Sequence, residues 1–225
     1  MEIKRTKDLH RAGVKMLAYG QAGAGKTCAI ATLPEAIVLS AEGGLLSIQG
    51  VDLPYIEIAT VSDLTQSITW LQSSHEATQY QSVAVDSISE IAEVVLAAEL
   101  KRQKDGRAAY GEMASAMNEV VRALRDLPGR HVYVTAKLDK TQDEMGRMLY
   151  SPSMPGKSMS QQLPYFFDEV LALRVEKDAD GNQWRGLLAQ PDGAWLAKDR
   201  SGRLDAWEPV DLLAVISKIG ANDNG

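Results

Sequence analysis

At every fixed position, the pattern G-x-x-x-x-G-K-[ST] is matched by Gly20-Gln21-Ala22-Gly23-Ala24-Gly25-Lys26-Thr27. The apolar run from Val14 to Tyr19 precedes this stretch and predicts a buried strand. Residues 28–33 follow it and predict a short helix, which ends before Pro34. A strand, a glycine-rich turn and the start of a helix form the structural context that this motif requires.

The chemistry of such a loop comes first from its backbone. Glycines let successive N–H groups point into one concavity, and the start of the following helix adds partial positive charge there. Lys26 can reach the β and γ phosphates of a nucleotide, and the Thr27 hydroxyl can bind Mg²⁺. We therefore expect residues 20–28 to bind a nucleoside triphosphate, with Cys28 as a small buried residue one turn inside the helix. The alternative is a glycine-rich turn that carries Gly-Lys-Thr by chance, and the flanking strand and helix disfavour it.

The composition is that of an ordinary globular protein. The 225 residues suffice for one α/β domain, and 45% of them are hydrophobic and 24% charged. No apolar run approaches the roughly 18 residues of a membrane span, and the first five residues have no signal-peptide character. The single cysteine excludes a disulfide framework, so we expect a reducing cytoplasm. We expect residues 1–225 to form one domain, with an irregular arm over 1–13 and a frayed tail over 220–225.

Strands and helices are expected to alternate along the chain, which predicts an α/β fold with a mostly parallel central sheet flanked by helices. The expected strands span 36–41, 55–58, 81–86 and 131–136, and the expected helices start near Ser62, Ile88 and Met113. Residues 169–175 and 183–189 predict a hairpin, Trp195 begins a further short strand, and a helix follows over 209–219. These last elements predict an antiparallel β extension at the C-terminal end. Between them, residues 138–162 are rich in Pro, Gly and polar side chains and predict a flexible loop.

Four residues fall at the ends of predicted parallel strands and should converge on one site: Gly20, Glu42, Asp86 and Lys137. Asp86 is the expected second ligand of Mg²⁺, together with Thr27. The next residue is Ser87, so the position that often carries the catalytic glutamate is empty, and Glu42 becomes the candidate that activates water. Glu42 as a solvated or capping residue is the alternative. Lys137 is either a sensor of the γ-phosphate or a solvated lysine.

A glutamate after the second strand, with none beside Asp86, resembles the arrangement of RecA-like ATPases. The stretches 134–139, 155–157 and 161–169 are similar to phage nucleotide-binding proteins of the AAA type, over about residues 13–215. That group includes RecA-like recombinases that consist of the core alone and act as single-strand annealing proteins. The resemblance implies a RecA-like P-loop core and ATP-dependent binding of single-stranded DNA in phage recombination, within the host cytoplasm. It also implies contact with a single-strand DNA-binding protein and no membrane.

The stretch from Lys198 to Arg200 resembles the K-x-R motif that RecA-like ATPases insert into the active site of a neighbouring subunit. The resemblance implies a homo-oligomer whose ATP site lies at the subunit interface, with Lys198 and Arg200 as catalytic groups. The alternative is a charged turn on the surface.

Two stretches of the chain are expected to contact DNA. The first is basic and carries an aromatic side chain that can stack on a base, and the second lies where RecA-like proteins carry a DNA-binding loop. Their candidates are Lys101, Arg102, Lys104, Arg107 and Tyr110 in the first, and Arg147, Tyr150 and Lys157 in the second. Either stretch can be a solvated loop, and the net charge of −6 argues against binding by bulk charge. Two other functions stay open: an ATPase that acts on protein partners, such as a helicase loader or packaging accessory, and a small-molecule kinase, which the K-x-R stretch disfavours.

Overall fold

The computed structural model describes residues 13–221, and most of the expected arm and tail lies outside this range. The strands of the described chain are β1 (Lys15–Tyr19), β2 (Ala36–Ser40), β3 (Tyr55–Glu57), β4 (Ser82–Asp86), β5 (His131–Gln142), β6 (Met148–Ser153), β7 (Glu169–Lys177), β8 (Gln183–Leu188), β9 (Lys198–Asp199) and β10 (Trp207–Glu208). The α-helices are α1 (Lys26–Ile30), α2 (Val61–Ser73), α3 (Ile88–Arg102), α4 (Gly106–Arg125), α5 (Lys157–Gln162) and α6 (Leu212–Gly220). Short 3-10 helices η2 (Leu45–Ile48), η3 (Glu76–Gln79) and η4 (Leu163–Phe166) lie between them.

The strands form one mixed sheet in the order β10-β8-β7-β1-β5-β4-β2-β3. From β3 to β7 all neighbouring strands pair in parallel, and β8 and β9 pair antiparallel with β7. This topology confirms the predicted fold class, a mostly parallel sheet with an antiparallel C-terminal extension. Among the described helices, none is both long and apolar enough to cross a membrane.

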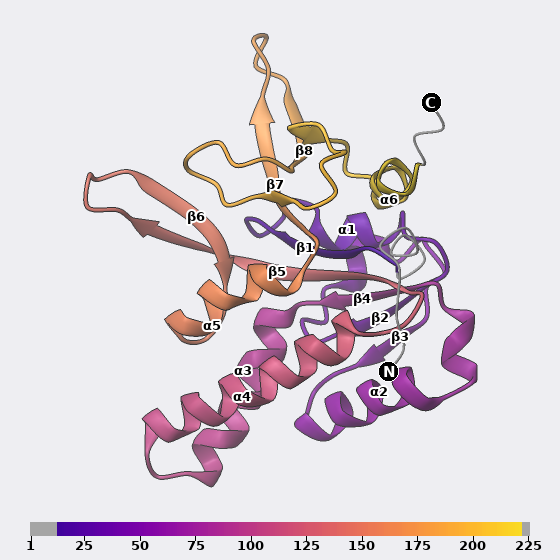
Figure 1. The fold of residues 1–225 in the computed structure, drawn as a ribbon, viewed down its shortest axis with the longest axis vertical. Helices are drawn as coiled ribbons and strands as arrows, with labels where there is room; N and C mark the ends of the chain where they lie inside the picture. Colours follow the sequence, from indigo (N-terminus) through magenta and orange to yellow (C-terminus); the bar gives the residue numbers. More distant parts are fainter. Residues whose placement is uncertain (1–12, 222–225) are drawn as a thin grey trace, which may run out of the picture.

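Helices cover both faces of the sheet, because the buried strands present apolar side chains alternately to either side. On one face, Leu17 and Tyr19 of β1 pack with residues of α2, α3 and α4. On the other face, Met16 and Ala18 pack with residues of α1 and α6 (Figure 1). The core therefore has two layers, and the carboxyl ends of the parallel strands meet at one edge between them.

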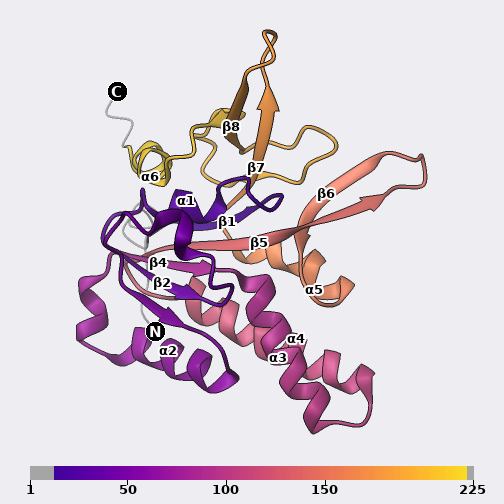
Figure 2. The same cartoon turned by 180° about the vertical axis from the view of Figure 1, so that it is seen from behind.

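Besides the β7–β8 pair, two hairpins project from that edge, as both Figure 1 and the view from behind in Figure 2 show. One is the helical hairpin of α3 and α4, and the other is the antiparallel pair of β5 and β6. The second hairpin corrects the prediction of a flexible loop over 138–162. Its turn is held by Asp143, whose carboxylate accepts hydrogen bonds from the backbone N–H groups of Met145 and Arg147 at 2.9 and 2.8 Å.

Two helix starts also differ from the prediction. Each is capped by a polar side chain that accepts a hydrogen bond from a backbone N–H of the first turn, and the pattern of apolar residues does not reveal this residue. Helix α2 begins after Thr60, whose hydroxyl and the Asp63 carboxylate form a reciprocal capping box, so Ser62 is not the cap. Helix α4 begins after Asp105, whose side chain accepts from the N–H of Arg107 at 2.9 Å. Residues 107–111 are therefore helical, although the sequence placed the start of this helix near Met113.

Candidate functional site

The glycine-rich loop leaves β1 in a conformation that only glycine adopts without strain. Gly23 and Gly25 have φ angles of +76° and +113°, in the left-handed region. Gly20 lies against β7, where a Cβ atom would stand 2.3 Å from the carbonyl oxygen of Leu173. Side chains at these positions would strain the loop or displace it from the neighbouring strand. The backbone is therefore free to form the concavity that the motif predicts.

Lys26 lies across this loop. Its Nζ donates hydrogen bonds to the carbonyl oxygens of Gly20 at 2.8 Å and Gln21 at 3.0 Å. Burial lowers the pKa of Lys26, and the nearby carboxylates of Glu42 and Asp86 offset this in part by raising it. The ammonium group is thus held above the loop and within the field of both predicted carboxylates.

Thr27 and Asp86 meet as the motif predicts. The Thr27 hydroxyl donates to Oδ2 of Asp86 at 2.7 Å, across 59 positions of sequence. The other carboxylate oxygen accepts from the Thr135 hydroxyl at 2.5 Å, and the Asp86 residue is only 1% exposed. A hydroxyl and a carboxylate oxygen side by side at the mouth of a phosphate loop are the donor set that holds Mg²⁺ on a nucleotide. The residues present therefore fit a magnesium nucleotide.

Glu42 lies next to this pair and is held by Ser87, which stands at the position where a catalytic glutamate often lies. The Ser87 hydroxyl donates a hydrogen bond to Oε1 of Glu42. Ser87 is fully buried, and its side chain also caps α3 by accepting from the N–H of Glu90 at 3.3 Å. The backbone N–H of Ala41 donates to the Asp86 carbonyl at 2.8 Å and fixes the ends of β2 and β4 together. The position after Asp86 carries no carboxylate, but its hydroxyl holds the carboxylate of Glu42.

Lys137 follows the buried part of β5 at the same edge. Its Nζ binds Oε2 of Glu90 at 2.5 Å, and this contact raises the pKa of the Lys137 ammonium. The carboxylate of Glu42 is close enough to raise it further. The backbone N–H of Lys137 donates to the Ser89 hydroxyl at 2.9 Å. The four strand-end residues therefore do lie together, although Lys137 is engaged with a helix residue rather than free above the loop.

One expectation about the loop is wrong. Cys28 was expected to be a small buried residue, but it is exposed. The helix is short, and its buried residues are Ala29 and Ile30. Cys28 precedes them and points away from the apolar layer. It still follows Thr27 directly and so remains part of the predicted phosphate site.

Lys198 and Arg200 lie far from the loop of their own chain. Asp199 pairs with Glu169, which is level with Met16 near the start of β1, and the phosphate loop follows the other end of that strand. Lys198 Nζ donates to the Pro164 carbonyl at 2.7 Å and also to that of Phe167.

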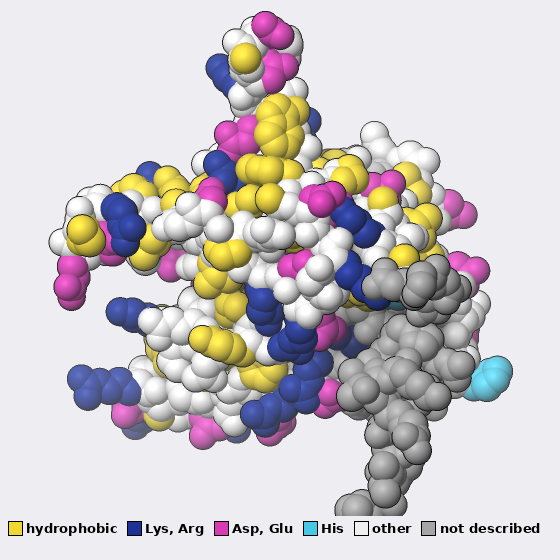
Figure 3. All heavy atoms as spheres, turned by 45° about the horizontal axis from the view of Figure 1, so that its top comes forward, with side chains coloured by type: hydrophobic (Ala, Val, Ile, Leu, Met, Phe, Trp, Pro, Cys, Tyr) yellow, Lys and Arg dark blue, Asp and Glu magenta, His cyan; other side chains and the backbone are white. Residues whose placement is uncertain are grey.

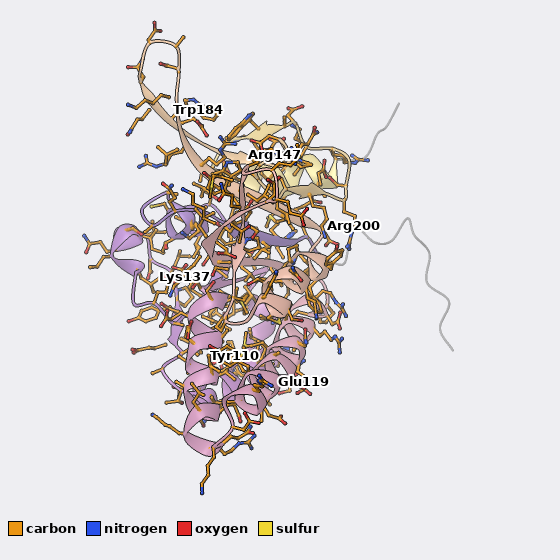
Figure 4. All side chains as sticks on the ribbon, turned by 90° about the vertical axis from the view of Figure 1, so that its left-hand side faces the viewer. Tyr110, Glu119, Lys137, Arg147, Trp184 and Arg200 are labelled. Carbon is orange, nitrogen blue, oxygen red and sulfur yellow. The ribbon has the colours of Figure 1, made fainter. Side chains whose placement is uncertain are left out.

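The Arg200 guanidinium pairs with Asp168 at 2.9 Å. Figure 4 shows Arg200 well apart from Lys137, which follows the residue of β5 that pairs with Tyr19 at the end of β1. Neither Lys198 nor Arg200 belongs to the site within one chain.

The predicted DNA contacts separate into two groups. At the tip of the helical hairpin, Lys101 and Arg102 end α3, Lys104 lies in the connection, and Arg107 and Tyr110 lie in the first turns of α4. Arg102 is paired with Glu99 at 2.8 Å. The Tyr110 ring lies 3.5 Å from the position of a Cβ on Gly156, so it adjoins Lys157 at the start of α5.

In the other group, two candidates are engaged within the chain. Tyr150 stacks on Trp195 with ring centroids 4.2 Å apart, and its backbone pairs with residues 194 and 196. This packing occupies the face on which a base would stack. Arg147, at the tip of the β5–β6 hairpin, pairs with Asp143 at 2.8 Å. The exposed cations at the helical tip and Lys157 are therefore better placed for a partner than Tyr150.

Three residues lie beside the predicted groups in a way that the sequence did not indicate: Ser87, Thr135 and Arg185. Ser87 adjoins Asp86 in sequence, so its position was visible, but its contact with Glu42 was not. Thr135 shows only as one polar residue in an apolar strand. Arg185, on β8, lies beside Gly25, and nothing in the local sequence indicates it.

Comparison with known proteins supplies a family. The AAA domain family matches residues 12–201, which is most of the chain. No curated protein matches it. Among solved structures, a KaiC-like protein from the hyperthermophilic archaeon Pyrococcus horikoshii OT3 is similar at 14% identity and a TM-score of 0.41, over 79% of this chain and 78% of that one. The family match covers the loop, Glu42, Asp86 and the parallel strands that carry them. The chain belongs to the AAA domain family of P-loop NTPases.

Proposed function

We propose that the protein binds ATP with Mg²⁺ at residues 20–28 and hydrolyses it. The observation that carries this proposal is the 2.7 Å contact between the Thr27 hydroxyl and Asp86, with Glu42 held beside it by Ser87. A hydroxyl, a buried carboxylate and a second carboxylate at the mouth of a phosphate loop suit phosphoryl transfer to water. ATP is the nucleotide that follows from the resemblance to RecA-like ATPases.

Each residue has a separate task in this scheme. Backbone N–H groups of the loop and the Lys26 ammonium hold the phosphates. Thr27 and Asp86 hold the magnesium ion, which when bound neutralises charge on the phosphates. Glu42 accepts a proton from the attacking water, and the Ser87 hydroxyl keeps its carboxylate turned toward that position. Lys137 is a proposed sensor of the γ-phosphate. In this role its ammonium group would exchange Glu90 for the phosphate.

Lys26→Ala is expected to weaken ATP binding by about 100-fold, because it removes the charged donor from the phosphate loop. Calorimetric titration with ATP and Mg²⁺ measures the change. Lys177→Ala, which removes an exposed lysine on β7, is the matched control and should bind like the unmodified protein. Equal affinity in Lys26→Ala and the unmodified protein would place the nucleotide elsewhere.

We further propose that the site is completed by a second copy of the chain, which supplies Lys198 and Arg200. Asp168 is hydrogen-bonded to Lys15 at the start of β1, and the phosphate loop begins at Gly20, after the end of this strand. Five residues of extended chain, about 16 Å, therefore separate Asp168 from the loop. Arg200 donates its backbone N–H to the Asp168 carbonyl, so it stays at the far end of that span. It is half exposed and faces outward, where a neighbouring subunit can approach. Contact through two different surfaces produces a ring or a filament.

Binding of single-stranded DNA is the second proposal, and annealing in phage recombination is the activity that the resemblance implies for it. Its support is the surface around Tyr110, which is exposed and adjoins Lys157 across Gly156. Lys101, Lys104 and Arg107 lie nearby, and among the described residues no carboxylate pairs with them. Exposed cations beside an exposed ring can bind phosphates and stack a base. An ATPase that acts on protein partners, such as a helicase loader or packaging accessory, remains the alternative.

Replacing Lys101, Arg102, Lys104 and Arg107 together with alanine is expected to weaken binding of a labelled single-stranded oligonucleotide. The slope of log affinity against log salt should also fall, by about 0.7 for each phosphate that the variant no longer neutralises. Arg125→Ala, at the other end of α4, is the control and should leave the slope unchanged. An unchanged slope in the fourfold variant would remove the helical tip from the DNA site. No binding by the unmodified protein would favour protein partners.

A further inference from the structure

The β7–β8 hairpin passes beside the phosphate loop. Strand β7 pairs with β1 as far as Ala172, opposite Tyr19, and then continues beyond the end of β1 to Lys177. Arg185 on β8 is opposite Val175, three residues past that point, or about 10 Å along the strand. Figure 1 shows the β7–β8 hairpin projecting beyond β1. The register of the strands places Arg185 at the level of the loop.

Arg185 lies beside the loop at Gly25. Its Cδ lies 3.6 Å and its Nε 4.0 Å from the position of a Cβ on Gly25. Gly25 immediately precedes Lys26, so the arginine stem rests on the part of the loop that should hold the phosphates. The guanidinium of a residue on another strand thus lies at the edge of the proposed site.

The direction of this side chain is fixed by its strand. Leu187, two residues on, is fully buried in the layer that also contains Ala29 and Ile30 of α1. Arg185 shares that face, because side chains alternate along a strand. Trp184 lies on the other face and packs edge-to-face on Trp207, with centroids 4.8 Å apart. Figure 4 shows Trp184 on the projecting hairpin. The hairpin cannot turn Arg185 away without breaking this packing.

The charge of Arg185 is uncompensated, unlike that of its neighbours. Arg174 on β7 pairs with Glu176 and with Asp192 at 2.6 Å. For Arg185, by contrast, the described residues provide neither an ion pair nor a hydrogen bond to the guanidinium. Asp178 and Asp180 lie in the turn between β7 and β8, and Glu176 on β7 is already paired with Arg174. Figure 3 shows acidic side chains at the tip of the projecting hairpin. A planar guanidinium with free donors binds phosphate oxygens in pairs.

We propose that Arg185 binds the phosphate chain of the nucleotide held by its own chain. This inference rests on the proposed function and adds a second cationic side chain to the site beside Lys26. Arg185 differs from Lys198 and Arg200 in acting within one chain, so its contribution does not require assembly. It also couples the hairpin to the nucleotide, because the same side chain would contact both.

The test compares affinities for ATP, ADP and AMP, each measured by calorimetry with Mg²⁺. Arg185→Ala is expected to weaken ATP binding by about tenfold or more, and the loss should be the same at low and high protein concentration. AMP, which lacks the β and γ phosphates, should be affected less than ATP. Arg185→Lys keeps the charge without the planar fork and should recover part of the affinity.

Gln183→Ala is the matched control, since Gln183 lies on the same strand and face two residues away. It should bind ATP like the unmodified protein, and all variants should unfold at the same temperature without nucleotide. Unchanged ATP affinity in Arg185→Ala would overturn the inference alone. An equal loss in Gln183→Ala would also overturn it, because the hairpin rather than the guanidinium would then matter. An unmodified protein that binds no ATP would overturn the proposed function as well.

Discussion

Glu42→Gln is expected to bind ATP normally and to hydrolyse it about 10³-fold more slowly. Glutamine has nearly the shape of glutamate and can still contact the Ser87 hydroxyl, so the loop and the ends of β2 and β4 should stay in place. It cannot accept a proton at neutral pH. The expected loss therefore falls on the rate of hydrolysis and leaves the binding constant unchanged, and the two are measured separately by steady-state turnover and calorimetry.

Glu57→Gln is the matched control, because Glu57 ends the adjacent strand β3 and pairs in register with Ser40. It removes a carboxylate from the same edge of the sheet, at an exposed position away from Ser87. Normal turnover in Glu42→Gln would show that another group activates water. Lost ATP affinity in Glu42→Gln would instead mean that the glutamate supports the loop.

Ser87 takes the place next to Asp86 and brings a glutamate from the neighbouring strand to it. Its side chain is fully buried and contacts Glu42, so the carboxylate that we propose as catalytic reaches the site from the end of β2. The sequence showed both residues, but their contact depends on the register of β2 against β4, where Ser40 lies opposite Asp86. Pairing of strands that are 46 positions apart in sequence is not a local property. The same limit applies to Thr135, which reaches Asp86 from β5.

The parallel core could be predicted because its strands are buried on both faces and read as continuous apolar runs. Residues 82–86 and 36–40 form strands as expected. The hairpin of β5 and β6 could not be found this way, since β5 leaves the core after Ala136 and its outer half is exposed and polar. Backbone hydrogen bonds and the Asp143 turn hold that part together. A polar strand and a flexible loop have similar compositions, so hydrophobic patterning did not distinguish them.

Arg200 provides the sharpest test of assembly. It is about 16 Å along the sheet from the phosphate loop of its own chain, and its guanidinium is paired with Asp168 at 2.9 Å. An arginine in that position can act on a phosphate only in a neighbouring subunit. Asp168 would then hold the side chain in an extended conformation before the subunits meet.

Arg200→Ala is therefore expected to bind ATP and to hydrolyse it about 10³-fold or more slowly, because a trans-acting arginine stabilises charge on the transferred phosphoryl group. Turnover per chain of the unmodified protein should rise with protein concentration. Mixing Arg200→Ala with Glu42→Gln should restore activity, because some interfaces then combine an intact Glu42 with an intact Arg200. Arg203→Ala, three residues along the same turn, is the control for a general loss of charge there. If light scattering shows intact assembly and the mixture stays inactive, Arg200 has no role in a neighbour's site.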